Sequence, residues 1–122
     1  RKIIGQQQSI SLTVTPYRAL FYALSPEPLA PITMKALPTV APGTVQRLTL
    51  ASAMPQGRQA VKVSMTLPDG SAAEWADSIT IVDRQGVTVD VPVALNDPKG
   101  TWTIRATDVY TGSTTTTSFS VK

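Results

Sequence analysis

Ten prolines and seven glycines are spread along the chain, and they leave few windows in which an α-helix could run. No apolar set recurs at the helical spacing of i, i+3, i+4 and i+7. Apolar and polar residues alternate instead, which is the period of a half-buried strand. In the run ISLTVT at residues 10–15, for example, Ile10, Leu12 and Val14 would share one face. The sequence therefore predicts a β protein.

The N-terminal third contains two further extended segments. Residues 18–24, RALFYAL, are apolar enough for a strand or a short buried segment. The prolines at positions 28, 31, 38 and 42 limit residues 26–42 to an edge strand or a loop that crosses between sheets. Within this region we expect Ile32 to Ala36 to pair. Its apolar run LAPITMKALPTV is interpreted either as core with a proline-protected edge or as an exposed patch for a protein partner.

From Val45 onward, strand candidates and glycine-containing turns alternate regularly. The candidate strands are residues 45–52, 60–67, 77–82, 87–93, 101–109 and 114–121, and the turns are residues 54–58, 68–70, 83–86, 95–100 and 110–113. Short strands at such regular spacing favour an antiparallel sandwich over crossover helices. With the N-terminal segments included, the prediction is an all-β, immunoglobulin-like β-sandwich of roughly seven to nine strands.

The length of 122 residues and mass of 13.0 kDa correspond to one domain with one core. We therefore interpret residues 1–122 as a single β-sandwich domain, with residues 1–9 as a candidate linker. The chain starts at Arg1 without an initiator methionine, and we expect it to be a piece excised from a longer protein.

The charge pattern bounds the partners. The net charge of +3 includes Arg1 and Lys2 at the N-terminus, and no run of Lys or Arg follows. Aromatic residues make up 6% of the chain, so the basic surface with interleaved aromatics that nucleic-acid binding needs is missing. The sequence also lacks an apolar run of membrane-spanning length. We expect neither nucleic-acid binding nor membrane insertion.

Cysteine and histidine are both absent, which removes disulfides, thiolate nucleophiles, the usual zinc ligands and the commonest general base. The sequence also lacks G-x-S-x-G and a phosphate-binding Gly-rich loop. Asp69, Asp97 and Asp108 lie in turns, where we expect their side chains to bond their own backbone. Without a D-x-D-x-D run, only a calcium site assembled from separate loops stays open. We predict no enzyme, no catalytic residues, no resident metal and no cofactor.

Trp102 is expected in the core, because it would share one strand face with Ile104 and Ala106 while threonines and Arg105 take the other. A buried tryptophan removes on the order of 150–250 Å² from water, which would make it the largest packing contribution in its sheet. The expected core also includes Val89, Val91, Ile79, Ile81, Phe119 and Val121.

Trp75 has two interpretations. Counting by twos from Ile79 places Trp75 inward if that strand extends back, whereas the neighbouring Glu74 and Asp77 indicate a loop. An exposed indole edged by carboxylates is typical of a sugar-stacking surface. Trp75, Glu74 and Asp77 are therefore our candidate sugar platform; Tyr110, Tyr17 and Tyr22 are poorer candidates.

The order of motifs resembles a family of domains. LPDG, DRQGVTVDVPVAL and PKGTWTIRATDVYTGSTTTTSFSV resemble the layout of bacterial immunoglobulin-like and macroglobulin-type sandwich domains across roughly residues 45–121. There a PDG-like turn precedes a G-apolar-x-apolar strand, then G-x-W/Y-x-L/I-x-A-x-D, and a last strand ends in F-x-V. The matching positions are Pro68, Asp69, Gly70, Gly86, Val87, Val89, Val91, Gly100, Trp102, Ile104, Ala106, Asp108, Phe119 and Val121.

The resemblance implies an accessory domain of the kind found at the C-terminal side of secreted bacterial glycoside hydrolases of the β-galactosidase type. It further implies an extracellular, periplasmic or cell-surface location and neighbouring domains of the same chain as partners. Our leading hypothesis is a non-catalytic module that packs against or spaces a catalytic domain. The alternatives are a carbohydrate-binding module that uses Trp75, with polysaccharide as its partner, and a protein-interaction or adhesion domain.

Overall fold

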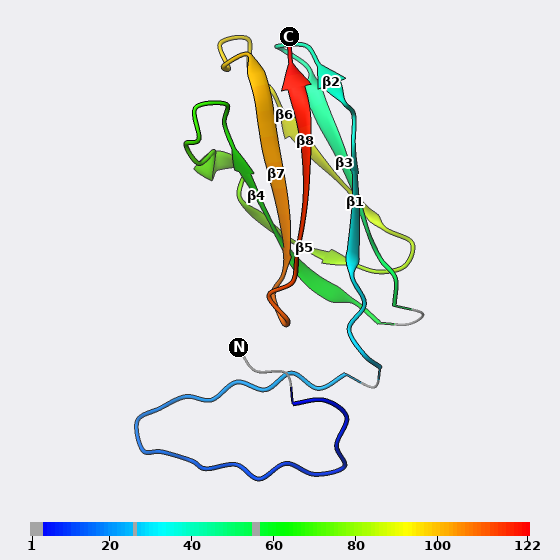
Figure 1. The fold of residues 1–122 in the computed structure, drawn as a ribbon, viewed down its shortest axis with the longest axis vertical. Coiled ribbons are helices and arrows are strands. Elements are labelled where there is room, and N and C mark those ends of the chain that lie inside the picture. Colours follow the sequence, from blue (N-terminus) through cyan, green and yellow to red (C-terminus); the bar gives the residue numbers. More distant parts are fainter. Residues whose placement is uncertain (1–3, 26, 55–56) are drawn as a thin grey trace.

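The computed structural model describes residues 4–25, 27–54 and 57–122, and the predicted turn at residues 54–58 falls partly outside this set. Two layered sheets form a β-sandwich with strand orders β1-β3-β6 and β2-β8-β7-β4-β5 (Figure 1). The elements are β1 (Ile32–Ala36), β2 (Thr39–Val40), β3 (Val45–Ser52), β4 (Gln59–Thr66), the 3₁₀ helix η1 (Glu74–Ala76), β5 (Ser78–Val82), β6 (Val87–Pro92), β7 (Gly100–Asp108) and β8 (Thr114–Val121). The predicted immunoglobulin-like sandwich is confirmed.

Two pairings set the topology. β5 hydrogen-bonds to β4 and therefore belongs to the five-stranded sheet. In a constant-type immunoglobulin domain, the strand at this point of the chain, strand D, instead joins the sheet of strands A, B and E, which corresponds to the three-stranded sheet here. β2 pairs parallel with β8, and the other strand pairs of the described residues are antiparallel. The chain therefore changes sheets between β1 and β2, within Leu37 and Pro38.

The Gln46 side chain supplies hydrogen-bond partners to the backbone where the chain changes sheets. Its side chain is fully buried, its Oε1 accepts the Leu37 N–H at 3.1 Å, and its Nε2 donates to the Leu37 carbonyl at 2.7 Å. A backbone that leaves one sheet loses its ladder partners, and unpaired buried groups are unfavourable. The side-chain amide of Gln46, on β3, supplies one acceptor and one donor in place of those ladder partners.

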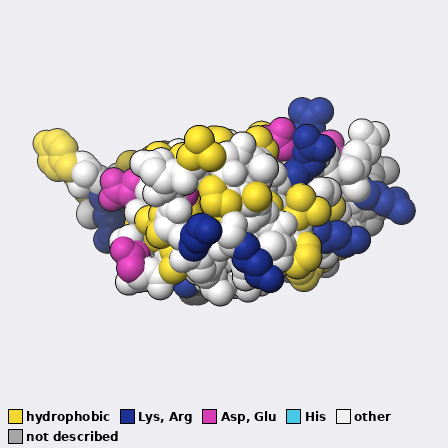
Figure 2. Space-filling view, turned by 90° about the horizontal axis from the view of Figure 1, so that it is seen from above, with side chains coloured by type: hydrophobic (Ala, Val, Ile, Leu, Met, Phe, Trp, Pro, Cys, Tyr) yellow, Lys and Arg dark blue, Asp and Glu magenta, His cyan; other side chains and the backbone are white. Residues whose placement is uncertain are grey.

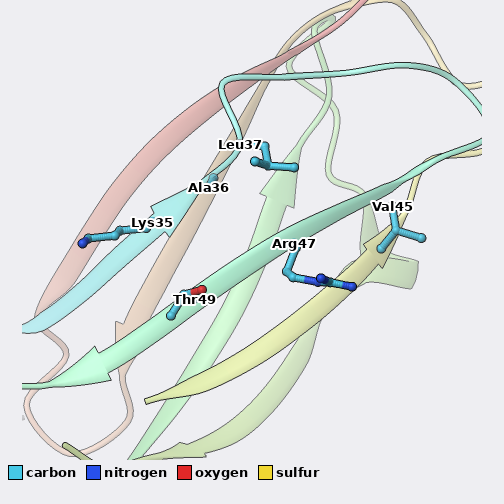
Figure 3. A pocket seen from close by; sticks show the side chains of 6 residues that line it. All are labelled: Lys35, Ala36, Leu37, Val45, Arg47 and Thr49. Carbon is cyan, nitrogen blue, oxygen red and sulfur yellow. The ribbon is translucent and has the colours of Figure 1, made fainter. Parts of the chain in front are cut away.

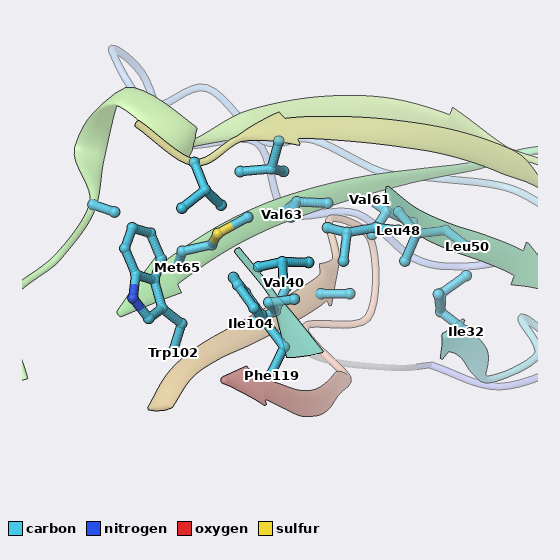
Figure 4. Close-up of a cluster of buried hydrophobic side chains, with 14 of the residues drawn as sticks. Ile32, Val40, Leu48, Leu50, Val61, Val63, Met65, Trp102, Ile104 and Phe119 are labelled. Atoms are coloured by element: carbon cyan, nitrogen blue, oxygen red, sulfur yellow. The ribbon is translucent and has the colours of Figure 1, made fainter. Parts of the chain in front are cut away.

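The core lies between the sheets and includes Trp102, Phe119, Leu48, Leu50 and Ile104 (Figure 4). Each of these side chains is 2% exposed or less. Of the other residues expected in the core, Val91 and Val121 are buried and Val89 packs against the cluster while partly exposed. The alternation within each strand supplies one apolar face per sheet.

The expectation for Ile79 and Ile81 is wrong: these side chains are 69% and 54% exposed. In the β4–β5 register, Val82 lies opposite buried Gln59, and Ile79 lies opposite exposed Lys62. Directly opposed residues share a face, so Val82 turns inward and both isoleucines turn outward. The polar-looking Ser78-Thr80-Val82 set is the inner face of β5.

The expectations for residues 10–15 and 18–24 are also wrong, since neither segment is a strand and Leu12, Val14 and Phe21 are exposed. These residues lie beyond the end of the sandwich, away from either sheet (Figure 1). Alternation makes a strand only when a sheet edge pairs with it. The segment nearer the sandwich behaves differently: Ile32 and Val40 are buried, so the described part of this segment, residues 27–42, contributes core rather than an exposed apolar patch.

Among the described residues, no helix combines the length and the hydropathy that crossing a membrane requires.

Candidate functional site

Trp75 lies in the short helix η1, in the connection between β4 and β5, and is 54% exposed. Its ring packs edge-to-face on Trp102, with centroids 6.3 Å apart and an interplanar angle of 70°. Trp102 is fully buried, and its ring also packs against the Phe119 ring, with centroids 5.7 Å apart. The loop interpretation of Trp75 is therefore the correct one, and the indole is half open to solvent while resting on the core.

The connection that carries Trp75 is held by backbone hydrogen bonds at both ends. Ala73 N–H donates to the Met65 carbonyl at 2.9 Å, and Asp77 N–H donates to the Glu74 carbonyl at 3.1 Å. The Trp102 indole N–H donates to the Pro98 carbonyl at 2.9 Å, which fixes the ring beneath. A half-exposed aromatic ring on a fixed support loses little conformational entropy when a ligand stacks on it.

The two carboxylates beside Trp75 differ in availability. The Glu74 side chain is exposed and makes no hydrogen bond within the described residues. Asp77 Oδ2 lies 2.9 Å from Lys62 Nζ, and the two side chains form a partly exposed ion pair. Glu74 therefore remains free to accept a hydroxyl hydrogen bond, whereas Asp77 would have to share its oxygens with Lys62.

A buried polar cluster at the opposite end of the sandwich was missed by the sequence reasoning. Gln59 Nε2 donates to Asp108 Oδ2 at 2.6 Å and to the Ala30 carbonyl at 3.0 Å, and its Oε1 accepts from the Ser52 hydroxyl. Gln59, Asp108 and Ser52 are all at most 4% exposed. The cluster thus joins the entry to β1, the β3–β4 connection and the β7–β8 turn.

A sequence signal for this cluster exists. Gln59 is two and four residues before Val61 and Val63, so it shares their inward face. Gln46 shares the inward face of Leu48 and Leu50 in the same way. A polar residue at an inward position must find a partner, so each glutamine marks a place where backbone or carboxylate groups come into the core.

The three turn aspartates bond nearby backbone as expected. Asp97 Oδ2 accepts the Ala94 N–H at 2.7 Å, and Asp108 Oδ1 accepts the Tyr110 N–H at 2.6 Å. Asp69 Oδ1 accepts the Ser71 hydroxyl at 2.6 Å and the Ser71 N–H at 2.9 Å. These hydrogen bonds, the hydroxyl first, hold the pKa of the Asp69 carboxyl below its ordinary value. In the described residues, no three acidic side chains gather into a metal-binding group.

A hollow of about 450 Å³ lies on the outer face of the three-stranded sheet, where the chain leaves β3 after the end of β1 (Figure 3). It is lined by Lys35, Ala36, Leu37, Val45, Arg47 and Thr49. Arg47 is already paired with Asp90 at 3.1 Å, and both side chains are more than half exposed. The hollow follows from the divergence of the strands and contains no buried polar group that would orient a ligand.

The end of the sandwich where β8 finishes shows a mixed surface, with basic, acidic and apolar side chains interspersed (Figure 2). A surface of this kind provides no single-charge field that would attract one class of polyelectrolyte.

The chain is similar to domains of several solved structures. A domain of a mutant alpha-2-macroglobulin from Salmonella superposes with a TM-score of 0.58 and 19% identity, over 82% of this chain and 7% of that one. The PKD domain of an M14-like peptidase from a Thermoplasmatales archaeon superposes with a TM-score of 0.49 and 20% identity, over 78% of this chain and 96% of that one. The CARDB domain of a Pyrococcus furiosus protein, in complex with di-metal ions, gives 0.46 and 13%, over 82% and 95%.

No protein-family model and no curated protein sequence matches the chain. The likeness to the macroglobulin domain shows a shared immunoglobulin-like fold, and this chain spans only 7% of the length of that macroglobulin.

Proposed function

We propose that this sandwich is a non-catalytic spacer module that holds the segments on its two sides at opposite ends of a rigid body. The observation that carries this proposal is the direction of the first and last strands. Ile32, at the start of β1, accepts a hydrogen bond from Thr115 near the start of β8, while β2 pairs parallel with the end of β8. The chain therefore enters at one end and leaves at the other (Figure 1).

Both ends of this path are anchored. Gln59 holds the Ala30 carbonyl at 3.0 Å, two residues before β1, and the Lys122 N–H donates to the Val40 carbonyl at 3.2 Å. The eight residues of β8 span about 26 Å at the rise of a strand. A module with fixed entry and exit adds a constant length between neighbours, which a flexible linker of the same composition does not.

The motif resemblance supports a secreted bacterial glycoside hydrolase of the β-galactosidase type as the parent protein, and hence an extracellular, periplasmic or cell-surface location. In that setting the module spaces the catalytic domain from its neighbour. The sequence adjoining this chain in its parent protein tests this part: a catalytic domain with two carboxylates about 5–10 Å apart is expected, and a parent without a hydrolase domain would remove it.

The spacer proposal is tested by a distance measurement between the two ends. The chain has no cysteine, so Pro28→Cys and Lys122→Cys give two unique spin-label sites. Electron–electron double resonance should give one narrow distance distribution centred at roughly 25–35 Å. Gln59→Leu removes the bond to Ala30 and should broaden the distribution, while Gln85→Leu on an exposed turn should leave it narrow. A broad distribution in the unmodified background contradicts a rigid spacer.

The half-exposed Trp75 favours a second function, carbohydrate binding. The indole fluorescence of the unmodified protein, compared with that of Trp75→Phe, in which only Trp102 emits, isolates the response of Trp75 and keeps its support. This difference should change with one polysaccharide of a plant, algal and microbial panel. Trp75→Ala should abolish that binding and Glu74→Gln should weaken it, whereas Tyr110→Ala at the other end should not. A flat titration across the panel rules out the sugar platform and leaves the spacer proposal standing.

A further inference from the structure

β5 differs from the other edge strands of the described sandwich because it has no proline or charge within the strand and is longer than two residues; its nearest charges are Asp77, paired with Lys62, and Asp83, just outside the strand. β1 contains Lys35 between Pro31 and Pro38, β2 is two residues long, and β6 contains Asp90 and Pro92. Prolines, charges and short length are the devices that prevent an open edge from pairing with another chain. β5, with the sequence SITIV, has neither a proline nor a charge, and among the described residues β4 is its only pairing partner.

The outer face of β5 is also apolar. Ile79 and Ile81 are 69% and 54% exposed, in a sheet whose outer surface is otherwise mostly threonine, serine and two cations. On the inner side, Val87 and Val89 of β6 pack against the core and remain partly exposed. The side of the sandwich between the edge strands β5 and β6 is therefore open. A strand added to β5 there would have apolar neighbours on its outer face, Ile79 and Ile81, and on its inner face, Val87 and Val89.

The chain itself contains a strand-like segment with no partner. Residues 18–24, RALFYAL, include Phe21 at 93% and Leu24 at 91% exposure, and they make no strand pairing in the described structure. Phe21 shares its parity with Ala19 and Ala23, and Leu24 shares its parity with Leu20 and Tyr22. A strand added to β5 needs apolar side chains on both faces, and this segment has them.

We propose that residues 18–24 of a second copy of this chain add to the free edge of β5, and that two copies exchange these segments reciprocally. The odd-numbered residues of the added strand lie beside Ile79 and Ile81. The even-numbered residues extend the core side beyond Thr80 and Val82. A reciprocal exchange is closed by a two-fold axis, so the assembly ends at a dimer.

Two observations favour a second copy over closure within one chain. Prolines 28 and 31 bias the connection to an extended course, and residues 4–25 project beyond the end of the sandwich (Figure 1). The area approaches what a specific interface needs. Phe21 is 93% exposed and Tyr22 is 47% exposed, so burying both rings in both copies removes roughly 400–700 Å², at about 150–250 Å² for a fully exposed ring. The four isoleucines and the strand backbones bring the total toward the roughly 1,200 Å² of a specific interface.

Sedimentation velocity of the full chain from low to high micromolar concentration tests this proposal. We expect a monomer–dimer equilibrium that weakens by about tenfold or more in Ile81→Lys and in Phe21→Asp. Both side chains are exposed, so the monomer fold should persist, which circular dichroism checks. Thr88→Lys, on the edge strand β6, is the matched control and should dimerise normally. An equal mixture of the Ile81→Lys and Phe21→Asp proteins should recover dimer, because one exchange remains intact.

Hydrogen exchange separates the remaining outcomes. In the dimer, the amides of residues 18–24 and of β5 should be protected together. A monomer at every concentration with exchange-open residues 18–24 overturns the proposal. A monomer in which those amides are protected also overturns it, because the segment then closes its own edge. A dimer that is indifferent to both substitutions places the interface elsewhere and refutes strand addition to β5.

Discussion

Replacing Gln46 by methionine removes the side-chain amide at the change of sheet while keeping an unbranched chain of similar volume. The substitution leaves the Leu37 N–H and carbonyl without the partners that lie 3.1 and 2.7 Å away. Gln46 itself is fully buried, so the methionine side chain enters an environment that accepts it. The change therefore isolates the hydrogen bonds from the packing.

The expected magnitude follows from two hydrogen bonds of about 0.5–1.5 kcal/mol each and from the penalty for unpaired groups of about 1–3 kcal/mol. Leu37 is half exposed, so water can reach part of its backbone and the penalty is at the low end. We expect the free energy of unfolding to fall by about 2 kcal/mol. For a domain of this size the melting temperature falls by about 6–12 °C.

The assay is urea unfolding followed by tryptophan fluorescence, together with hydrogen exchange at the Leu37 amide. That amide should change from slow to fast exchange while the amides of β7 and β8 stay slow. Gln85→Met, on an exposed turn, is the control and should change stability by less than about 0.5 kcal/mol. A loss below about 0.5 kcal/mol in Gln46→Met, with Leu37 still protected, would refute the argument that Gln46 holds the sheet change.

Three further outcomes are expected. Trp102→Ala should lower the free energy of unfolding by about 3–5 kcal/mol in urea melts, because a fully buried ring is lost; a loss under about 1 kcal/mol would contradict its place in the core. Carbon-13 NMR titration should find the pKa of Asp69 below its ordinary value, and Ser71→Ala should raise it; because the folded pKa is the lower one, the stabilisation is present above the unfolded pKa and is lost as pH falls through the folded pKa. Gly86→Ala should destabilise more than Gly70→Ala, since both have φ near +85° but only the former places Cβ 2.9 Å from a backbone carbonyl; equal thermal shifts would show that the close approach relaxes freely.

The bounds of β3 and β8 match their predicted residues, because segments that contain glycine or proline flank β3 on both sides and a glycine-containing turn precedes β8. Residues 10–15 alternate equally well and form no strand. Hydrogen bonding between strands is non-local, so a local pattern can state the preference of a segment and cannot state whether a partner edge is present.

The candidate sites show the same division. The inward position of Trp102 follows from parity with Ile104 and Ala106, whereas β5 has two plausible parities, and its pairing with β4 selects the one that exposes Ile79 and Ile81. The partner of Gln59 lies 49 residues away at Asp108, and no spacing rule in the sequence connects them.

The sequence by itself determined the fold class, the strands from Val45 onward and the aspartates that close turns, because each depends on neighbours within a few residues. The tertiary structure decided which face of β5 is buried, where the buried glutamines find partners, how β1 passes to the other sheet and which edges stay open. Those features depend on which strands become neighbours, and strand pairing is chosen by burial over the whole sandwich rather than by any one segment.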